Sequence, residues 1–227
     1  MTITRFERFL PLSGVLAGLC FALSSVLTMK LPDAPKGDGH VYVQWLADHQ
    51  GLAMGSGFAA GFFCLTMLLF AAGLRMALRS GEPGESSYSS AAFAGAVGVA
   101  LAVAVMGWVT LAAAQAAHDG SAASAVALGY LSSFGFIPWV ATSGALFLAA
   151  GLGGLRTATL PKPLAIVTIV LGVLCLLGPT GIAVYFATPF WLIITGVVLY
   201  RRLGAASSPI PAQAPSTRAA TPASSVS

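Results

Sequence analysis

The residues of this chain that could do chemistry are three histidines, each with an aspartate within two positions along the sequence. Imidazole is the commonest metal ligand and titrates near neutral pH, so these pairs could form a Zn²⁺ or Cu²⁺ site or a pH sensor. The alternative is that polar residues collect in loops because they avoid membrane spans, and no regular zinc-ligand spacing is present. The candidate metal ligands are His40, His49, His118, Asp38, Asp48 and Asp119.

Motifs for catalysis are absent from the sequence, which contains no Walker A loop, HExxH, CxxC or GxSxG. Cys20, Cys64 and Cys175 fall within apolar runs. Buried thiols act as small hydrophobic side chains or, where helices meet, as soft-metal ligands. We predict no catalytic residues and no cofactor, which favours a non-enzymatic protein.

Composition indicates a membrane protein. The chain has 227 residues, of which 57% are hydrophobic and 8% charged, whereas a soluble domain carries about 25% charged residues. The formal charge of +4 does not indicate nucleic-acid binding, because the basic residues lie at the ends of apolar runs rather than in one patch. The expected surroundings are therefore a lipid bilayer.

Five uncharged stretches are long enough to cross a bilayer, which requires about 20 apolar residues. The last stretch, 163–200, has 38 residues and would be about 57 Å long as one helix. We split it at Gly178-Pro179-Thr180-Gly181, a sequence that favours a tight turn. The prediction is an all-α, six-span transmembrane bundle over residues 1–203, with spans at about 9–29, 51–74, 91–117, 125–155, 164–178 and 182–200.

The basic residues predict the orientation of this bundle. With both termini inside, nine Lys and Arg residues face the cytoplasm and only Lys30 and Lys36 lie outside, as the positive-inside rule requires. Residues 204–227 are rich in Ala, Ser, Pro and Thr and predict a disordered cytoplasmic tail. We expect a multi-pass protein of the plasma (inner) membrane. The nine inside residues are Arg5, Arg8, Arg75, Arg79, Arg156, Lys162, Arg201, Arg202 and Arg218.

Glycine spacing suggests where helices pack. Gly14 and Gly18 form one GxxxG step, and Gly57 and Gly61 form another. Such steps let helix backbones approach closely, here within the chain or with a second copy, although glycine is abundant throughout this sequence. The segment 40–50 is predicted to form a short interfacial helix, and the span 125–155 is expected to bend at Pro138.

Polar residues inside the spans limit the mechanism. The central portions of the spans contain no Asp, Glu, Lys or His, which disfavours an ion-coupled transporter. The span 125–155 carries the hydroxyl pairs Ser132-Ser133 and Thr142-Ser143 beside a proline. These hydroxyls could line a substrate pathway or make interhelical hydrogen bonds.

Three short segments resemble a known group of proteins. They are Val43-Gln44-Trp45-Leu46-Ala47-Asp48-His49, and the pair Gly178-Pro179-Thr180-Gly181 with Pro189-Phe190-Trp191. In these segments the chain resembles uncharacterised six-span membrane proteins common in high-GC Gram-positive bacteria. The resemblance implies the same six-helix architecture and carries no activity.

Three functions remain open from the sequence. The first is a non-enzymatic scaffold, accessory subunit or binding module with a membrane-protein partner or a second copy. The second is a transporter of small molecules or lipids, which a hydroxyl-lined cavity beside the span 125–155 would favour. The third is an extracytoplasmic metal-binding or pH-sensing protein.

Overall fold

The computed structural model describes residues 9–32, 39–82, 87–178 and 180–206. For residues 204–206 it describes the backbone alone. Within these ranges the chain folds into helices joined by turns, which confirms the predicted all-helical class. Five segments are long and apolar enough to cross a membrane, in agreement with a multi-pass membrane protein. They are Leu10–Thr28, Gln50–Arg79, Tyr88–His118, Ala122–Arg156 and Gly181–Leu203.

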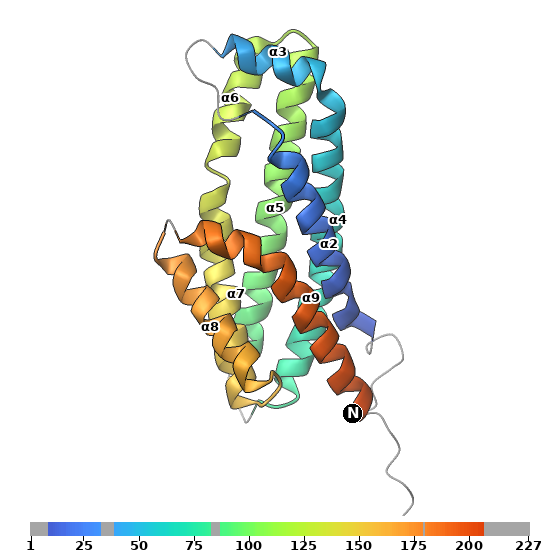
Figure 1. The fold of residues 1–227 in the computed structure, drawn as a ribbon, viewed down its shortest axis with the longest axis vertical. Coiled ribbons are helices and arrows are strands. Elements are labelled where there is room, and N and C mark those ends of the chain that lie inside the picture. Colours follow the sequence, from blue (N-terminus) through green and yellow to red (C-terminus); the bar gives the residue numbers. More distant parts are fainter. Residues whose placement is uncertain (1–8, 33–38, 83–86, 179, 207–227) are drawn as a thin grey trace, which may run out of the picture.

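The helices form one elongated bundle around a central antiparallel pair (Figure 1). This pair, α4 and α5, runs the full length of the molecule, and α3 lies across one end, called here the α3 end. The opposite end carries the arginines that close α4, α7 and α9, and is called the arginine end. The elements are η1 (Leu10–Leu12), α2 (Ser13–Thr28), α3 (His40–Asp48), α4 (Gln50–Arg79), α5 (Tyr88–His118), α6 (Ala122–Ser133), α7 (Phe136–Arg156), α8 (Lys162–Leu176) and α9 (Gly181–Ala206).

Small residues on α5 let its neighbours approach closely. Its buried side chains are mainly alanine, with glycine and valine. A Cβ atom built on Gly107 would lie 2.5 Å from the Cβ of Ala60, and one built on Gly95 would lie 2.5 Å from the backbone N of Leu146. Because apolar lipid gives no hydrophobic drive to helix association, this close contact is what holds α4 and α7 against α5.

The predicted span 125–155 is divided into α6 and α7 by a break at Phe134–Gly135. The expected bend lay at Pro138, four residues after Phe134. A proline ring clashes with the carbonyl four residues earlier, so the break precedes the proline. The backbone there tightens to i to i+3 hydrogen bonds, including Gly135 N to Ser132 O at 3.1 Å and Ile137 N to Phe134 O at 3.1 Å.

The hairpin of α8 and α9 corresponds to the divided stretch 163–200. Gly178, with φ of 72°, lies in the turn after α8, where a left-handed conformation favours glycine. The Thr180 hydroxyl donates to the Leu174 carbonyl at 2.6 Å and closes the turn. Trp191 Nε1 donates to Thr168 Oγ1 at 2.8 Å, which joins the two helices in the core.

The first helix of this hairpin was predicted at 164–178, and α8 has the same length but begins two residues earlier. α8 has 15 residues and is about 22 Å long, which is less than the roughly 30 Å of a hydrocarbon core. It is therefore the one predicted span that is not among the five long apolar helices. α9 continues to Ala206, three residues into the segment expected to be disordered, and residues 207–227 lie outside the described part.

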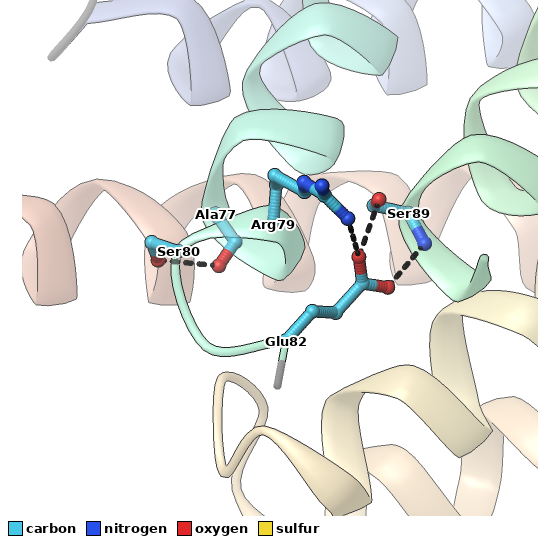
Figure 2. A network of polar contacts seen from close by, with 5 residues as sticks. All are labelled: Ala77, Arg79, Ser80, Glu82 and Ser89. Carbon is cyan, nitrogen blue, oxygen red and sulfur yellow. Dashed lines mark hydrogen bonds and ion pairs between the residues drawn. The ribbon is translucent and has the colours of Figure 1, made fainter. Parts of the chain in front are cut away.

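A buried carboxylate organises the turn between α4 and α5 (Figure 2). Glu82 accepts hydrogen bonds from the Ser89 backbone N and from the Ser89 hydroxyl, both at 2.7 Å. Arg79 Nη1 lies 3.4 Å from the same carboxylate, and the Glu82 side chain is fully buried. Since Ser87 supplies no side-chain cap to α5, Glu82 binds one of the free N–H groups at this positive helix end.

Candidate functional site

The bundle contains a cavity of about 120 Å³ beneath α3, called here the chamber. Side chains from α2, α4, α5 and α6 form its walls. Tyr42 and Leu46 of α3 cover it, and Tyr185 of α9 contributes from the arginine side. The lining residues are Ser24, Thr28, Leu31, Pro32, Tyr42, Leu46, Ser56, Val103, Met106, Gly107, Thr110, Ser132 and Tyr185.

The chamber exists because the α8–α9 hairpin does not reach the α3 end. The turn of the hairpin lies about halfway along the bundle (Figure 1). A Cβ atom built on Gly181 would lie 3.1 Å from Val140 and 3.3 Å from Phe136, so the turn packs beside the start of α7. Beyond this level the walls formed by the described residues belong mainly to α2, α4, α5 and α6, and α3 covers the space between them.

Seven of the lining residues carry hydroxyl groups. Thr28 Oγ1 and Ser56 Oγ are hydrogen-bonded at 2.9 Å and join α2 to α4. Tyr185 accepts a hydrogen bond from Ser25 at 2.9 Å, which holds its ring against α2. Ser24, Thr110 and Ser132 donate their hydroxyl protons to backbone carbonyls. Their oxygens therefore remain as acceptors for the hydroxyl groups of a ligand.

The chamber has no formal charge. Its lining contains no Asp, Glu, Lys, Arg or His. Tyr42 belongs to α3, outside the long apolar helices, and burial raises the pKa of its phenol, which stays neutral at physiological pH. A charged ligand would lose its hydration without gaining a countercharge, at a large cost in free energy. The chemistry of the wall therefore suits an uncharged polar group.

Beside the chamber lies an apolar opening of about 260 Å³, called here the side slot. It shares Thr28, Met106 and Tyr185 with the chamber, so the two spaces adjoin. Its outer side chains Ile182 and Phe186 are exposed on the flank of the bundle. The remaining lining residues are Ser25, Met29 and Phe136.

A second apolar opening, of about 410 Å³, lies between α5 and the α6–α7 break. Met106 and Ser132 line both this opening and the chamber. It follows from the same proline-induced break that divides α6 from α7, because Gly135 leaves room for Met106 there.

An aromatic cluster packs against Tyr185 on the arginine side of the chamber. The ring of Tyr185 lies 4.8 Å from that of Phe21 and 5.1 Å from that of Trp139, measured between centroids. Phe63 extends the cluster at 5.2 Å from Phe21. Phe21, Phe63 and Trp139 are buried in the core, so this part of the bundle is packed with side chains.

The predicted metal ligands do not converge within the described residues. No group of three His, Cys, Asp or Glu side chains there could hold a metal ion, and Asp38 lies outside the described ranges. His49 stacks on Trp45 with ring centroids 4.1 Å apart. Asp119 accepts from Gln115 at 3.0 Å at the end of α5. The metal or pH-sensing hypothesis stays a prediction, which metal analysis of the purified protein would test.

The four predicted packing glycines lie in different environments. A Cβ atom on Gly18 would lie 2.7 Å from the Pro189 carbonyl oxygen, so Gly18 faces α9. One on Gly14 would lie 2.6 Å from the Phe70 ring and 3.0 Å from the Leu192 carbonyl oxygen, so Gly14 faces both α4 and α9. Gly57 faces α5, because a Cβ atom built on it would lie 3.3 Å from the Gly107 carbonyl oxygen. Gly61 meets nothing within 4 Å.

Sequence reasoning identified only part of the chamber. Ser132 belongs to the hydroxyl pairs noted in the span 125–155, but Thr28, Ser56 and Tyr185 were not singled out. One available signal was the spacing of Ser24 and Thr28, four residues apart on one helix face. The position of Ser56 opposite them depends on the packing of α4, which the sequence does not reveal.

The fold and the chamber define the class as an all-helical protein with apolar helices of membrane-spanning length and an uncharged polar cavity. Comparison with protein-family models, curated proteins and solved structures finds no match to this chain.

Proposed function

We propose that this chain is a six-span protein of the plasma membrane with both termini in the cytoplasm. The excess of basic residues at the arginine end supports this orientation. α8 and its turn form the fifth span, and α9 returns to the cytoplasm. The α3 end then faces outward.

Three residues support a position for the chamber at the outer boundary of the hydrocarbon layer. Lys30, Trp108 and Tyr130 each lie within two positions of a chamber residue. The two aromatic side chains are 60% and 45% exposed, and lysine and amphipathic aromatics favour the membrane interface. The chamber therefore lies where the headgroup region meets the acyl chains.

The proposed function is non-enzymatic binding of a small uncharged molecule in the chamber. The observation that carries this proposal is a cavity with seven hydroxyl-bearing residues and no charged side chain in its lining. Its volume of about 120 Å³ approaches the roughly 150 Å³ of an engineered cavity that holds benzene. The protein acts as a binding module for which the bundle is a fixed frame.

A thermal unfolding experiment tests this proposal. Glycerol should raise the unfolding temperature of the purified protein more than glycerate, a charged molecule of similar size, because a ligand that binds the folded state shifts the folding equilibrium toward it. Ser132→Leu, which fills the chamber, should abolish the difference. Equal effects of the two compounds on the wild type would overturn the proposal.

The chain offers a matched control at the next residue. Ser132 and Ser133 both donate hydrogen bonds to the Gly129 carbonyl, at 2.8 and 3.0 Å, but only Ser132 lines the chamber. Ser133→Leu should keep the full response to glycerol. This control also removes general effects of glycerol on solvation, which act on both variants alike.

A transporter is the second candidate, and the chamber favours it because Ser132 places a hydroxyl-lined cavity beside the span 125–155. The aromatic cluster of Phe21, Phe63, Trp139 and Tyr185 opposes it, because these side chains fill the path toward the arginine end. Proteoliposomes in a glycerol gradient decide between the two. Swelling above protein-free vesicles that Ser132→Leu abolishes would favour transport, and its absence would favour binding.

A further inference from the structure

We propose that the ligand is a neutral amphiphile of the outer leaflet, with its hydroxyl-bearing headgroup in the chamber and its acyl chain in the side slot. This inference rests on the proposed binding function and names the class of ligand. It starts from the juxtaposition of a polar cavity and an apolar opening that share three lining residues.

The two spaces have complementary polarity along one path. At the inner end of the path, Ser56 and Thr28 present hydroxyls that are hydrogen-bonded to each other at 2.9 Å. At the outer end, Met29, Ile182 and Phe186 present exposed apolar side chains. A lipid has the same division, because its headgroup is polar and its acyl chain is apolar. A lipid that lies along this path therefore contacts polar groups with its headgroup and apolar groups with its acyl chain.

The position of the path fits entry from the bilayer. Lys30 and Trp108 mark the headgroup boundary, as argued above. Ile182 and Phe186 lie near the start of α9, which descends from the α8–α9 turn toward the arginine end. An acyl chain that leaves the chamber through the side slot therefore enters the hydrocarbon layer directly, without crossing water.

The sizes of the two spaces agree with this division. The chamber, at about 120 Å³, holds a compact headgroup, and the side slot, at about 260 Å³, has more than twice that volume for part of a chain. The headgroup is neutral because the chamber lining contains no ionised group to pair with a charge. Glycerol esterified with a single fatty acid has all of these properties.

The test compares three probes on the full-length protein in detergent, with binding read by native mass spectrometry and thermal unfolding. The probes are 1-oleoylglycerol, oleate and glycerol. We expect 1-oleoylglycerol to bind as one copy and at least tenfold more tightly than either glycerol or oleate, because only it combines the neutral head with the chain. Oleate that binds as tightly as 1-oleoylglycerol would overturn the inference.

Two substitutions on α9 test whether the acyl chain of the ligand lies in the side slot. Ile182→Trp narrows the side slot and leaves the chamber hydroxyls in place, whereas Ile194→Trp changes an exposed residue of α9 that does not line the slot. Ile182→Trp should weaken the binding of 1-oleoylglycerol at least tenfold and leave the rise in unfolding temperature with glycerol unchanged. Ile194→Trp should change neither.

The outcomes separate the two proposals. A response to glycerol that depends on Ser132, together with 1-oleoylglycerol binding that is insensitive to Ile182→Trp, would overturn the lipid inference and leave the binding function standing. Loss of every Ser132-dependent response, to glycerol and to 1-oleoylglycerol alike, would overturn both.

Discussion

At the residue scale, Glu82 shows how one buried charge can hold a turn. Its carboxylate accepts from the backbone and hydroxyl of Ser89, and Arg79 lies 3.4 Å away. The Glu82 side chain is fully buried, whereas the Arg79 side chain is 59% exposed. The hydrogen bonds to Ser89 therefore contribute more to stability than the ion pair, which solvent screens.

Glu82→Ala should lower the free energy of unfolding by about 1–3 kcal/mol, because Ser89 loses two charge-assisted hydrogen bonds. For a chain of this size each kcal/mol corresponds to roughly 2–4 °C in unfolding temperature. Arg79→Gln is the control and should cost less than about 1 kcal/mol. A larger loss for Arg79→Gln, measured by thermal unfolding of the purified protein, would contradict this account.

The residues of the chamber also predict how binding depends on pH. Burial raises the pKa of Tyr42, so its neutral form persists and a cost of ionisation arises only above its ordinary value of about 10. The glycerol-induced rise in unfolding temperature should therefore be the same at pH 5.5, 7.0 and 8.5. A site that depends on histidine would instead change across this range, because imidazole titrates near neutrality.

At the element scale, close helix packing depends on which glycine faces a neighbour. Gly18 faces α9, and Gly14 faces both α4 and α9. Gly196 of α9 in turn packs against η1, since a Cβ atom built on it would lie 2.6 Å from the Pro11 carbonyl oxygen. The sequence indicated the first two through their spacing, but not their partner. Gly61 completes the second GxxxG step in the sequence and yet meets nothing within 4 Å.

This difference gives a matched pair of substitutions. Gly18→Ala should destabilise the protein by about 1–2 kcal/mol, because the new methyl group would press on the Pro189 carbonyl and on Ile193. Gly61→Ala should cause no loss, and alanine is the better helix former by about 0.5–1 kcal/mol. Thermal unfolding of both variants checks the prediction, and a larger loss at Gly61 would contradict it.

The elements were more predictable than the site. Charge placement and the length of a bilayer crossing were enough to locate the long apolar helices. The short helix predicted over 40–50 is α3, which spans His40–Asp48. The break lies a few residues before the bend predicted at Pro138, because the proline ring clashes with the carbonyl of the preceding turn. The chamber could not be predicted in full, because the contact between Thr28 and Ser56 depends on the rotation of α2 against α4.

At the scale of the whole molecule, the unequal lengths of the helices determine where polar space can exist. α4 and α5, with 30 and 31 residues, are about 45 Å long and exceed the roughly 30 Å hydrocarbon layer. α2 with η1 is much shorter, with 19 residues. In the proposed orientation the long helices project beyond the outer boundary, and α3 covers the space that the short helices leave open.

The last prediction concerns α8, whose 15 residues make it the shortest of the proposed spans. If the hairpin of α8 and α9 crosses the membrane, its turn reaches the outer headgroup region next to the chamber, where water and a small polar reagent have access. Thr180 is exposed in this turn, so Thr180→Cys should react with a membrane-impermeant maleimide applied to intact cells. The native residues Cys20, Cys64 and Cys175 are first replaced by alanine, so that only the introduced thiol reacts.

Two further cysteines calibrate this labelling. Ser121→Cys, in the α5–α6 turn at the α3 end, should react from outside, and Ser80→Cys, after α4 at the arginine end, should react only after the cells are opened. Labelling at position 121 but not at 180 would mean that the hairpin re-enters from the cytoplasm without crossing. In that case the bundle has four full crossings, both termini stay on the cytoplasmic side, and the chamber keeps its place near the outer surface. Labelling at position 80 alone in intact cells would instead mean that the orientation is the reverse of the proposed one, with the chamber on the cytoplasmic side.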